Sequence, residues 1–136
     1  EDTCIGREHY LKKNYVELHR TGIPMADEII ESVFEEYPLR AHIASTYLNE
    51  MRQAFTNIRA SLRPGGHLVL VTADNTLVGR PFQTTRYLQQ LLQDELGLVK
   101  ILELVDPIPS RALLTKRKGR SEAVIKHETI SVFTSR

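Results

Sequence analysis

The protein has 136 residues, a length that fits one domain, and 41% of them are hydrophobic, which is enough to fill a core. Its 18 Lys and Arg residues against 17 Asp and Glu residues leave a net charge of +1, which excludes a strongly basic polyanion binder. The single cysteine, Cys4, excludes an internal disulfide and fits the reducing cytoplasm, and no apolar run approaches the roughly 18–20 residues that cross a membrane.

The charges are distributed unevenly along the chain. Residues 24–37 contain five acidic residues and no Lys or Arg, whereas residues 110–121 contain five basic residues and no acid. The sequence begins with Glu1 rather than Met, which is consistent with a fragment of a longer protein.

Residues 1–22 are polar and weakly periodic, and we interpret them as a surface arm with one helical turn, in which Tyr and His side chains could pack. Pro24 suits the first position of a helix, because the N–H that it lacks is not needed there. Apolar residues then recur at helical spacing and predict a helix over about 24–36: Met25, Ile29, Ile30 and Phe34.

A longer helix is predicted from Pro38 to Leu62. Its apolar residues recur at steps of three and four and form one stripe: Leu39, Ile43, Tyr47, Met51, Phe55, Ile58 and Leu62. The turn Pro64-Gly65-Gly66 ends this helix. The run "HLVLVTA", residues 67–73, predicts a strand that is covered on both faces in a parallel sheet.

The second half of the chain predicts one more helix and two more strands. We expect Thr84 or Thr85 to cap a helix that ends at Gly97 and turns four residues inward: Tyr87, Leu88, Leu91 and Leu92. Residues 98–105 predict a strand, residues 106–121 a long basic loop, and residues 123–135 a last strand with Ile130, Val132 and Phe133 as its core. Helices that alternate with strands indicate an α/β sheet, but three strands are few for so many helices, so part of the sheet is missing.

The polar residues that follow the first strand are the first candidate site. In open α/β sheets ligands bind beyond the carboxyl ends of the strands, so Asp74 and Asn75 could hydrogen-bond a cofactor or a flat heterocycle. The alternative is an ordinary polar turn. In the following loop, Gly79-Arg80-Pro81 could bring Arg80 to a ligand, although a plain connector fits as well.

The basic loop is the second candidate. Its charges could neutralise nucleic-acid phosphates, or the loop could simply be solvated: Arg111, Lys116, Arg117, Lys118 and Arg120. The five histidines have no zinc-ligand spacing, no phosphate-binding loop is present, and no serine lies in a nucleophile elbow. The sequence therefore predicts no metal site and no self-contained catalytic constellation.

Four stretches resemble the amino-group DNA methyltransferases, a class I S-adenosylmethionine-dependent family found in restriction–modification systems. "NIRASLRPGGHLVLVTADN" is similar to the helix-to-strand step late in class I methyltransferases. "ADNTLVGRPFQTTRYL" resembles the loop and helix that follow, and "VDPIPSRALLTKR" the segment with a single Arg, here Arg111. "IKHETISVFTS" resembles the closing strand. The resemblance covers nearly the whole chain and is most specific over residues 39–135.

The resemblance implies a single partial domain over residues 1–136. Residues 1–37 would be a polar arm and helical insert, and residues 38–136 the carboxyl-terminal half of a Rossmann-like methyltransferase sheet, with strands five to seven. The last strand would run antiparallel and lie between the fifth and sixth. Asp74, Asn75, Arg80 and Arg111 would contact the substrate, and Lys116, Arg117, Lys118 and Arg120 the DNA.

The same resemblance implies S-adenosylmethionine as the cofactor of the complete enzyme and an adenine or cytosine amino group as the methyl acceptor. The sequence lacks both the glycine-rich cofactor turn and the Pro-Pro-Tyr catalytic motif of that family. We therefore expect this chain alone to be inactive and to need the missing amino-terminal half or a partner chain. The alternatives are part of an RNA or small-molecule methyltransferase, or a non-catalytic nucleic-acid-binding or interaction module. An uncovered strand edge and apolar face would favour self-association.

Overall fold

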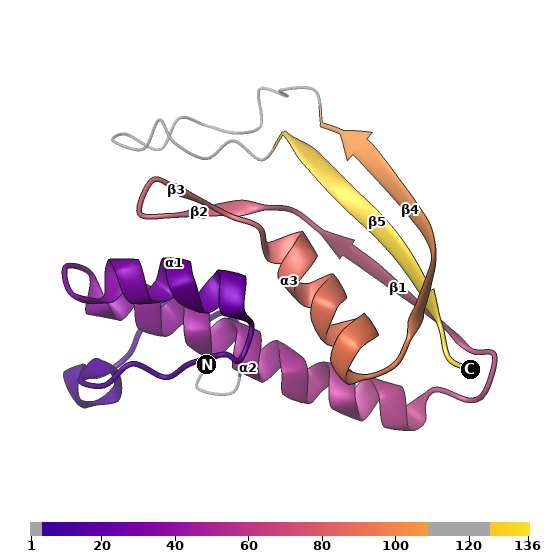
Figure 1. Ribbon diagram of the computed structural model, residues 1–136, viewed down its shortest axis with the longest axis horizontal. Coiled ribbons are helices and arrows are strands. Elements are labelled where there is room, and N and C mark those ends of the chain that lie inside the picture. The colour runs from indigo at the N-terminus through magenta and orange to yellow at the C-terminus, as the bar shows by residue number, and fades with distance from the viewer. Residues whose placement is uncertain (1–3, 109–125) are drawn as a thin grey trace.

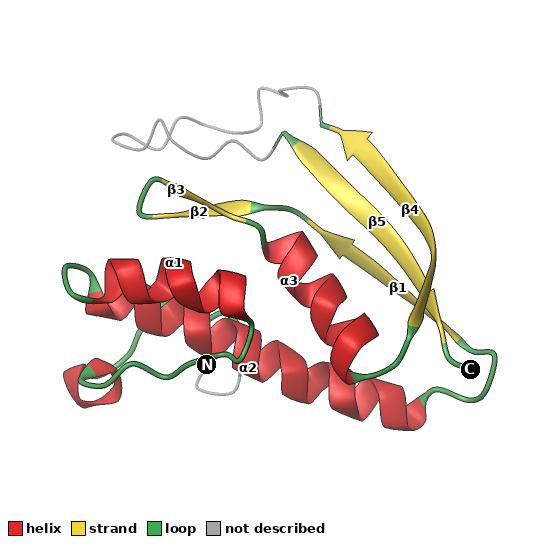
Figure 2. Ribbon diagram, viewed as in Figure 1, coloured by secondary structure: helices red, strands yellow, loops and turns green. Residues whose placement is uncertain are grey.

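The computed structural model describes residues 4–108 and 126–136, and over this part the protein is a mixed α/β structure. The described residues form three α-helices, a three-stranded sheet and a separate two-stranded hairpin. Figures 1 and 2 show the helices beside the sheet and the hairpin at one end of its first strand. Among the described residues, no helix combines the length and the apolar composition that a bilayer span requires.

The amino-terminal half is helical, as predicted. The arm contains one 3₁₀ turn, η1 (Lys12–Tyr15), and is followed by helices α1 (Pro24–Phe34) and α2 (Pro38–Ser61), each of which begins at its proline. The Asp27 carboxylate accepts hydrogen bonds from the Thr21 and Gly22 backbone N–H groups, at 2.7 and 3.0 Å. These bonds fix the direction in which the arm enters α1.

The three-stranded sheet consists of β1 (His67–Thr72), β4 (Val99–Pro107) and β5 (His127–Thr134). Its order is β1-β5-β4, and β5 runs antiparallel to both neighbours, so β1 and β4 are parallel to each other. The prediction that the last strand runs antiparallel between the other two is confirmed. The register between β4 and β5 shifts between Lys100 and Leu102, where Ile101 makes a bulge.

The prediction of a loop after the first strand is wrong: residues 75–82 form a hairpin of β2 (Asn75–Leu77) and β3 (Arg80–Phe82). Its two-residue turn has positive φ at both positions, 50° at Val78 and 73° at Gly79, as in a type I′ turn. Leu77 and Phe82 are buried and anchor the hairpin in the core.

Helix α3 (Thr84–Gln90) continues into a π-helical turn, η2 (Leu91–Glu95). The prediction that Thr84 or Thr85 caps this helix is wrong. Gln83 is the residue at the cap, and the Thr85 backbone N–H donates to the Asp74 carboxylate at 3.0 Å. Gly97 ends the segment with a φ of 65°, as predicted.

The two faces of the sheet differ. Inner-face side chains join the helices in one core, whose largest fully buried members include Ile23, Ile30, Leu48, Tyr87, Leu88, Leu91, Leu92 and Phe133. On β1 the side chains of the outer face are exposed, with Val69 at 61% and Val71 at 56%. The prediction that β1 is covered on both faces is therefore wrong. Of the three residues predicted as the core of β5, only Phe133 is fully buried, because Ile130 and Val132 alternate onto the outer face and are half-buried.

Candidate functional site

The predicted strand-end site lies where β1 meets the amino terminus of α3. The Asp74 side chain is exposed, and one of its oxygens accepts the Thr85 backbone N–H. Beside this contact, the Thr72 hydroxyl donates to the Thr85 hydroxyl at 3.0 Å. A carboxylate at a helix amino terminus is stabilised by the unpaired N–H groups there. Asp74 thus connects the end of β1 to the start of α3.

Asn75 is adjacent to Asp74 but belongs to the hairpin. Its side-chain oxygen accepts the backbone N–H of Thr76 at 2.8 Å, and its backbone pairs opposite Phe82 in β3. This local hydrogen bond is typical of Asn in turns. The amide group is exposed, so it remains accessible to solvent.

Arg80 lies at the other end of the same hairpin. It pairs with Leu77, two residues farther along β2 than Asn75, and its guanidinium donates a hydrogen bond to the Ser32 hydroxyl on α1. The structure therefore brings Asp74 and Asn75 together but directs Arg80 toward α1. Through this hydrogen bond the Arg80 side chain connects the hairpin to α1.

The remaining predicted residues lie outside the described part of the chain: Arg111, Lys116, Arg117, Lys118 and Arg120. The residues on either side are placed, since the Ile108 backbone N–H donates to the Lys126 carbonyl at 2.9 Å. Ile108 and Lys126, the described residues on either side of 109–125, thus lie together at one end of the sheet. This is also the end where β1 stops, because Thr72 pairs with Thr129 and Pro107 pairs with His127.

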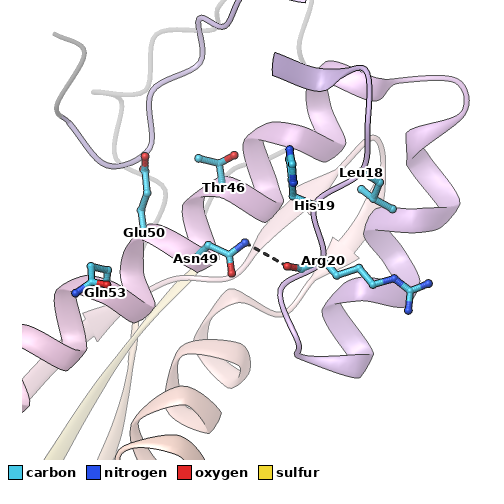
Figure 3. Close-up of a pocket in the computed structure, with 7 residues that line it drawn as sticks. All are labelled: Leu18, His19, Arg20, Thr46, Asn49, Glu50 and Gln53. Carbon is cyan, nitrogen blue, oxygen red and sulfur yellow. Dashed lines mark hydrogen bonds between the residues drawn. The ribbon is translucent and has the colours of Figure 1, made fainter. Parts of the chain in front are cut away.

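A polar groove between the arm and α2 was not predicted as a site. This groove is open to solvent and has a volume of about 550 Å³. Figure 3 shows the residues that line it: Leu18, His19 and Arg20 from the arm, and Thr46, Asn49, Glu50 and Gln53 from α2. The Asn49 amide donates to the Arg20 carbonyl at 3.3 Å and joins the two walls. Polar residues on the side of α2 away from its apolar stripe were the available signal for this groove.

Arg52 connects three segments close to this groove. Its guanidinium forms a two-pronged ion pair with Glu95 of η2, at 2.7 and 2.9 Å. It also donates to the Asn49 side chain at 2.7 Å and to the Thr21 carbonyl. Paired planar contacts of this kind hold Arg and carboxylate in a fixed geometry. Arg52 therefore ties the arm and α2 to the end of the α3 segment.

His42 is buried between α2 and the arm. Its ring contacts Tyr10 edge-to-face, with centroids 4.5 Å apart, and Tyr15 and His19 lie at 6.2 and 6.1 Å. Burial lowers the pKa of His42, and nearby His19 and Arg7 lower this pKa further, while Glu50 raises it. The sequence indicates that Tyr and His side chains of the arm could pack, but it does not indicate that they cover a histidine of α2.

A polar cluster lies between α3 and the edge of the sheet. The Gln89 amide donates to the Ser131 hydroxyl and to Glu103, at 2.8 and 2.7 Å, and the Lys100 ammonium donates to Glu103 at 2.6 Å. The pKa of Glu103 is lowered mainly by the hydrogen bond from Lys100 and next by the hydrogen bond from Gln89. Ser131 is buried and contacts an amide rather than a base, so these contacts provide no activated nucleophile.

The described residues do not form a complete cofactor site. In the placed part of the chain no group of His, Cys, Asp and Glu side chains could hold a metal ion. For S-adenosylmethionine, the sequence has no glycine-rich turn after a strand, and one Asp74 oxygen is already bound to α3. The residues present therefore do not fit this cofactor by themselves.

Comparison with protein-family models, with curated proteins and with solved structures gave no match for this chain.

Proposed function

We propose that this chain is the carboxyl-terminal part of an S-adenosylmethionine-dependent DNA methyltransferase of the amino-group type. In this proposal β1, β4 and β5 are the last three strands of a Rossmann-like sheet. The rest of the enzyme supplies the methyl donor site and the Pro-Pro-Tyr motif. The chain described here supplies one wall of the substrate pocket, at the end where β1 stops and the basic segment 109–125 begins.

The observation that carries this proposal is the order of the strands. A final strand that runs antiparallel between two parallel strands is what the family resemblance implies, and β5 has this place between β1 and β4. The helix between the two parallel strands, α3, also follows the expected sequence of elements. The Asp74 and Asn75 pair lies at the carboxyl end of β1, where ligands of α/β sheets bind.

The two edges of the sheet provide further support. Strand β4 has a bulge at Ile101, charged residues at Lys100 and Glu103, and a proline at 107, all of which discourage pairing with another strand. Strand β1 has no Lys, Arg, Asp, Glu or Pro and no bulge in its pairing with β5. In the proposed enzyme β4 ends the sheet, whereas β1 continues it into the missing half.

A non-catalytic module is the second candidate. The observation that favours it is that Asp74, Asn75 and Arg80 each form a hydrogen bond within the chain. Such contacts are sufficient reason for these residues to be present. In this alternative the open edge and outer face of the sheet would bind a partner protein, and no methyl transfer would follow from completing the sheet.

The two candidates are distinguished by a complementation assay. The chain is purified alone and after co-expression with the polypeptide encoded upstream of it, and each sample is incubated with DNA and tritiated S-adenosylmethionine. We expect no transfer by the chain alone and transfer by the pair, with N6-methyladenine or N4-methylcytosine among the digested nucleosides. Transfer by the chain alone, or a stable pair that methylates no DNA, would contradict the proposal.

A further inference from the structure

The arm is held on α2 by aromatic contacts that have no role in the proposed function. Three rings of the arm surround the His42 ring, from Tyr10, Tyr15 and His19. His42 is only 7% exposed. Because rings from residues 10–19 form much of the surroundings of His42, its burial depends on the arm being in place.

The surroundings of His42 favour its neutral form. Its Nδ1 atom is buried and has no hydrogen-bond partner among the described residues, and its Nε2 atom lies 3.4 Å from the Thr46 hydroxyl. A charged imidazole needs hydrogen-bond acceptors for both N–H groups, and burial without them is costly. The aromatic contacts supply neither acceptor.

The charged groups around the ring add to this preference. Arg7 of the arm lies 4.9 Å from the centroid of Tyr10 and 3.6 Å from the Glu50 carboxylate of α2. The groups that face His42 are thus Arg7, Tyr10, Tyr15 and His19 from the arm, and Thr46 and Glu50 from its own helix. Arg7 and His19 oppose a positive charge on His42, and among the described residues Glu50 is the group that favours it.

We propose that protonation of His42 releases residues 7–20 from α2, so that the arm is a pH-dependent cover. The neutral ring packs under Tyr10 and Tyr15, whereas the charged ring is stable only when water can reach it. Release would also open the groove of Figure 3, since Leu18, His19 and Arg20 form one of its walls. Thr46 and Glu50 of α2, which are half-buried with the arm in place, would then become exposed.

The direction in which pH changes the closure of the arm follows from the direction of the pKa shift of His42. With the arm closed, the pKa of His42 is lowered from its ordinary value of 6.5, and in the proposal the pKa returns to that value when the arm is released. Above pH 6.5, the closed arrangement of the arm therefore has its full stability. Below that value the equilibrium constant for closure falls by up to about tenfold per pH unit, until the pKa of the closed form is reached.

The test is an NMR titration of the 136-residue protein from pH 8 to pH 5, which follows the rings of His42, Tyr10, Tyr15 and Phe133. We expect the Tyr10 and Tyr15 signals to move toward solvent-exposed values as His42 titrates, with the change starting below pH 6.5. Phe133 lies in the sheet and reports global unfolding, so its signals should stay unchanged. In His42→Phe, which keeps the ring without the charge, Tyr10 and Tyr15 should stay packed down to pH 5.

His127→Phe is the matched control, because His127 is exposed on β5, and it should titrate like the unmodified protein. His42→Gln provides a second uncharged replacement if His42→Phe does not fold. Protonation of His42 while Tyr10 and Tyr15 remain packed would overturn the proposal. The same pH-dependent release in His42→Phe or His42→Gln would also overturn it.

Discussion

On β1 the two faces of the three-stranded sheet are both apolar, but their surroundings are very different. On β1, Leu68 and Leu70 pack against the helical core, while Val69 and Val71 between them are exposed. The register places Val69, Val132 and Leu102 in one row of the outer face and Val71, Ile130 and Leu104 in the next. Contiguous apolar side chains on a surface usually indicate a contact site. The outer face therefore has the composition of a buried surface without the cover.

The largest expected change in stability comes from comparing one substitution on each face of the sheet. Phe133→Ala removes a fully buried ring and should lower the free energy of unfolding by about 3–5 kcal/mol. Val69→Ala on the outer face should lower it by less than about 1 kcal/mol, mainly through the strand preference of valine. Urea unfolding of both variants checks the comparison. A similar loss in both would mean that the outer face is covered in solution.

A smaller effect on stability is expected at the hairpin. Its strand residues Leu77 and Phe82 are buried, whereas its turn residue Val78 has a strained backbone conformation. Val78 is a β-branched residue with a φ of 50°, a conformation that costs such residues about 1–3 kcal/mol. Val78→Asn, which suits the first position of a type I′ turn, should raise the free energy of unfolding by about 1 kcal/mol. Thermal unfolding measures the gain, and Val78→Ile, which keeps the branched side chain, should give none. A loss of stability in Val78→Asn would show that Val78 makes a contact worth more than the strain.

Much of the fold could be predicted from the sequence because it depends on local spacing. The stripe of α2 and the prolines at positions 24 and 38 defined the two long helices, and Gly97 defined the end of the α3 segment. The placement of the last strand came from the family resemblance rather than from the pattern of residues. Apolar runs identify strands but do not say which strands pair.

The errors have physical causes that spacing does not contain. The hairpin was missed because its turn is Val78-Gly79 rather than Asn-Gly, and because Pro81 interrupts the strand pattern. The run Leu68 to Val71 reads as buried on both sides, since a continuous apolar run does not indicate whether one face lacks a cover. The cap of α3 comes from Asp74, eleven residues before Thr85, so no local motif could identify it.

The candidate site was predicted less completely than the fold. Asp74 and Asn75 lie together at the strand end as expected, but the contact between Arg80 and Ser32 joins residues 48 positions apart in sequence. The cover over His42 likewise joins residues 10–19 to position 42. Contacts over such separations depend on how the helices pack, and the spacing of residues within one segment carries no information about it.

The central claim is that this sheet is unfinished at the β1 edge and on its outer face. Sedimentation velocity at several concentrations, together with binding of a dye that fluoresces on apolar surfaces, tests it most directly. We predict concentration-dependent self-association and dye binding by the unmodified chain, both reduced in Val71→Lys and unchanged in Val78→Lys, which alters an exposed valine outside the sheet. A monomer at all concentrations that binds no dye would contradict the claim.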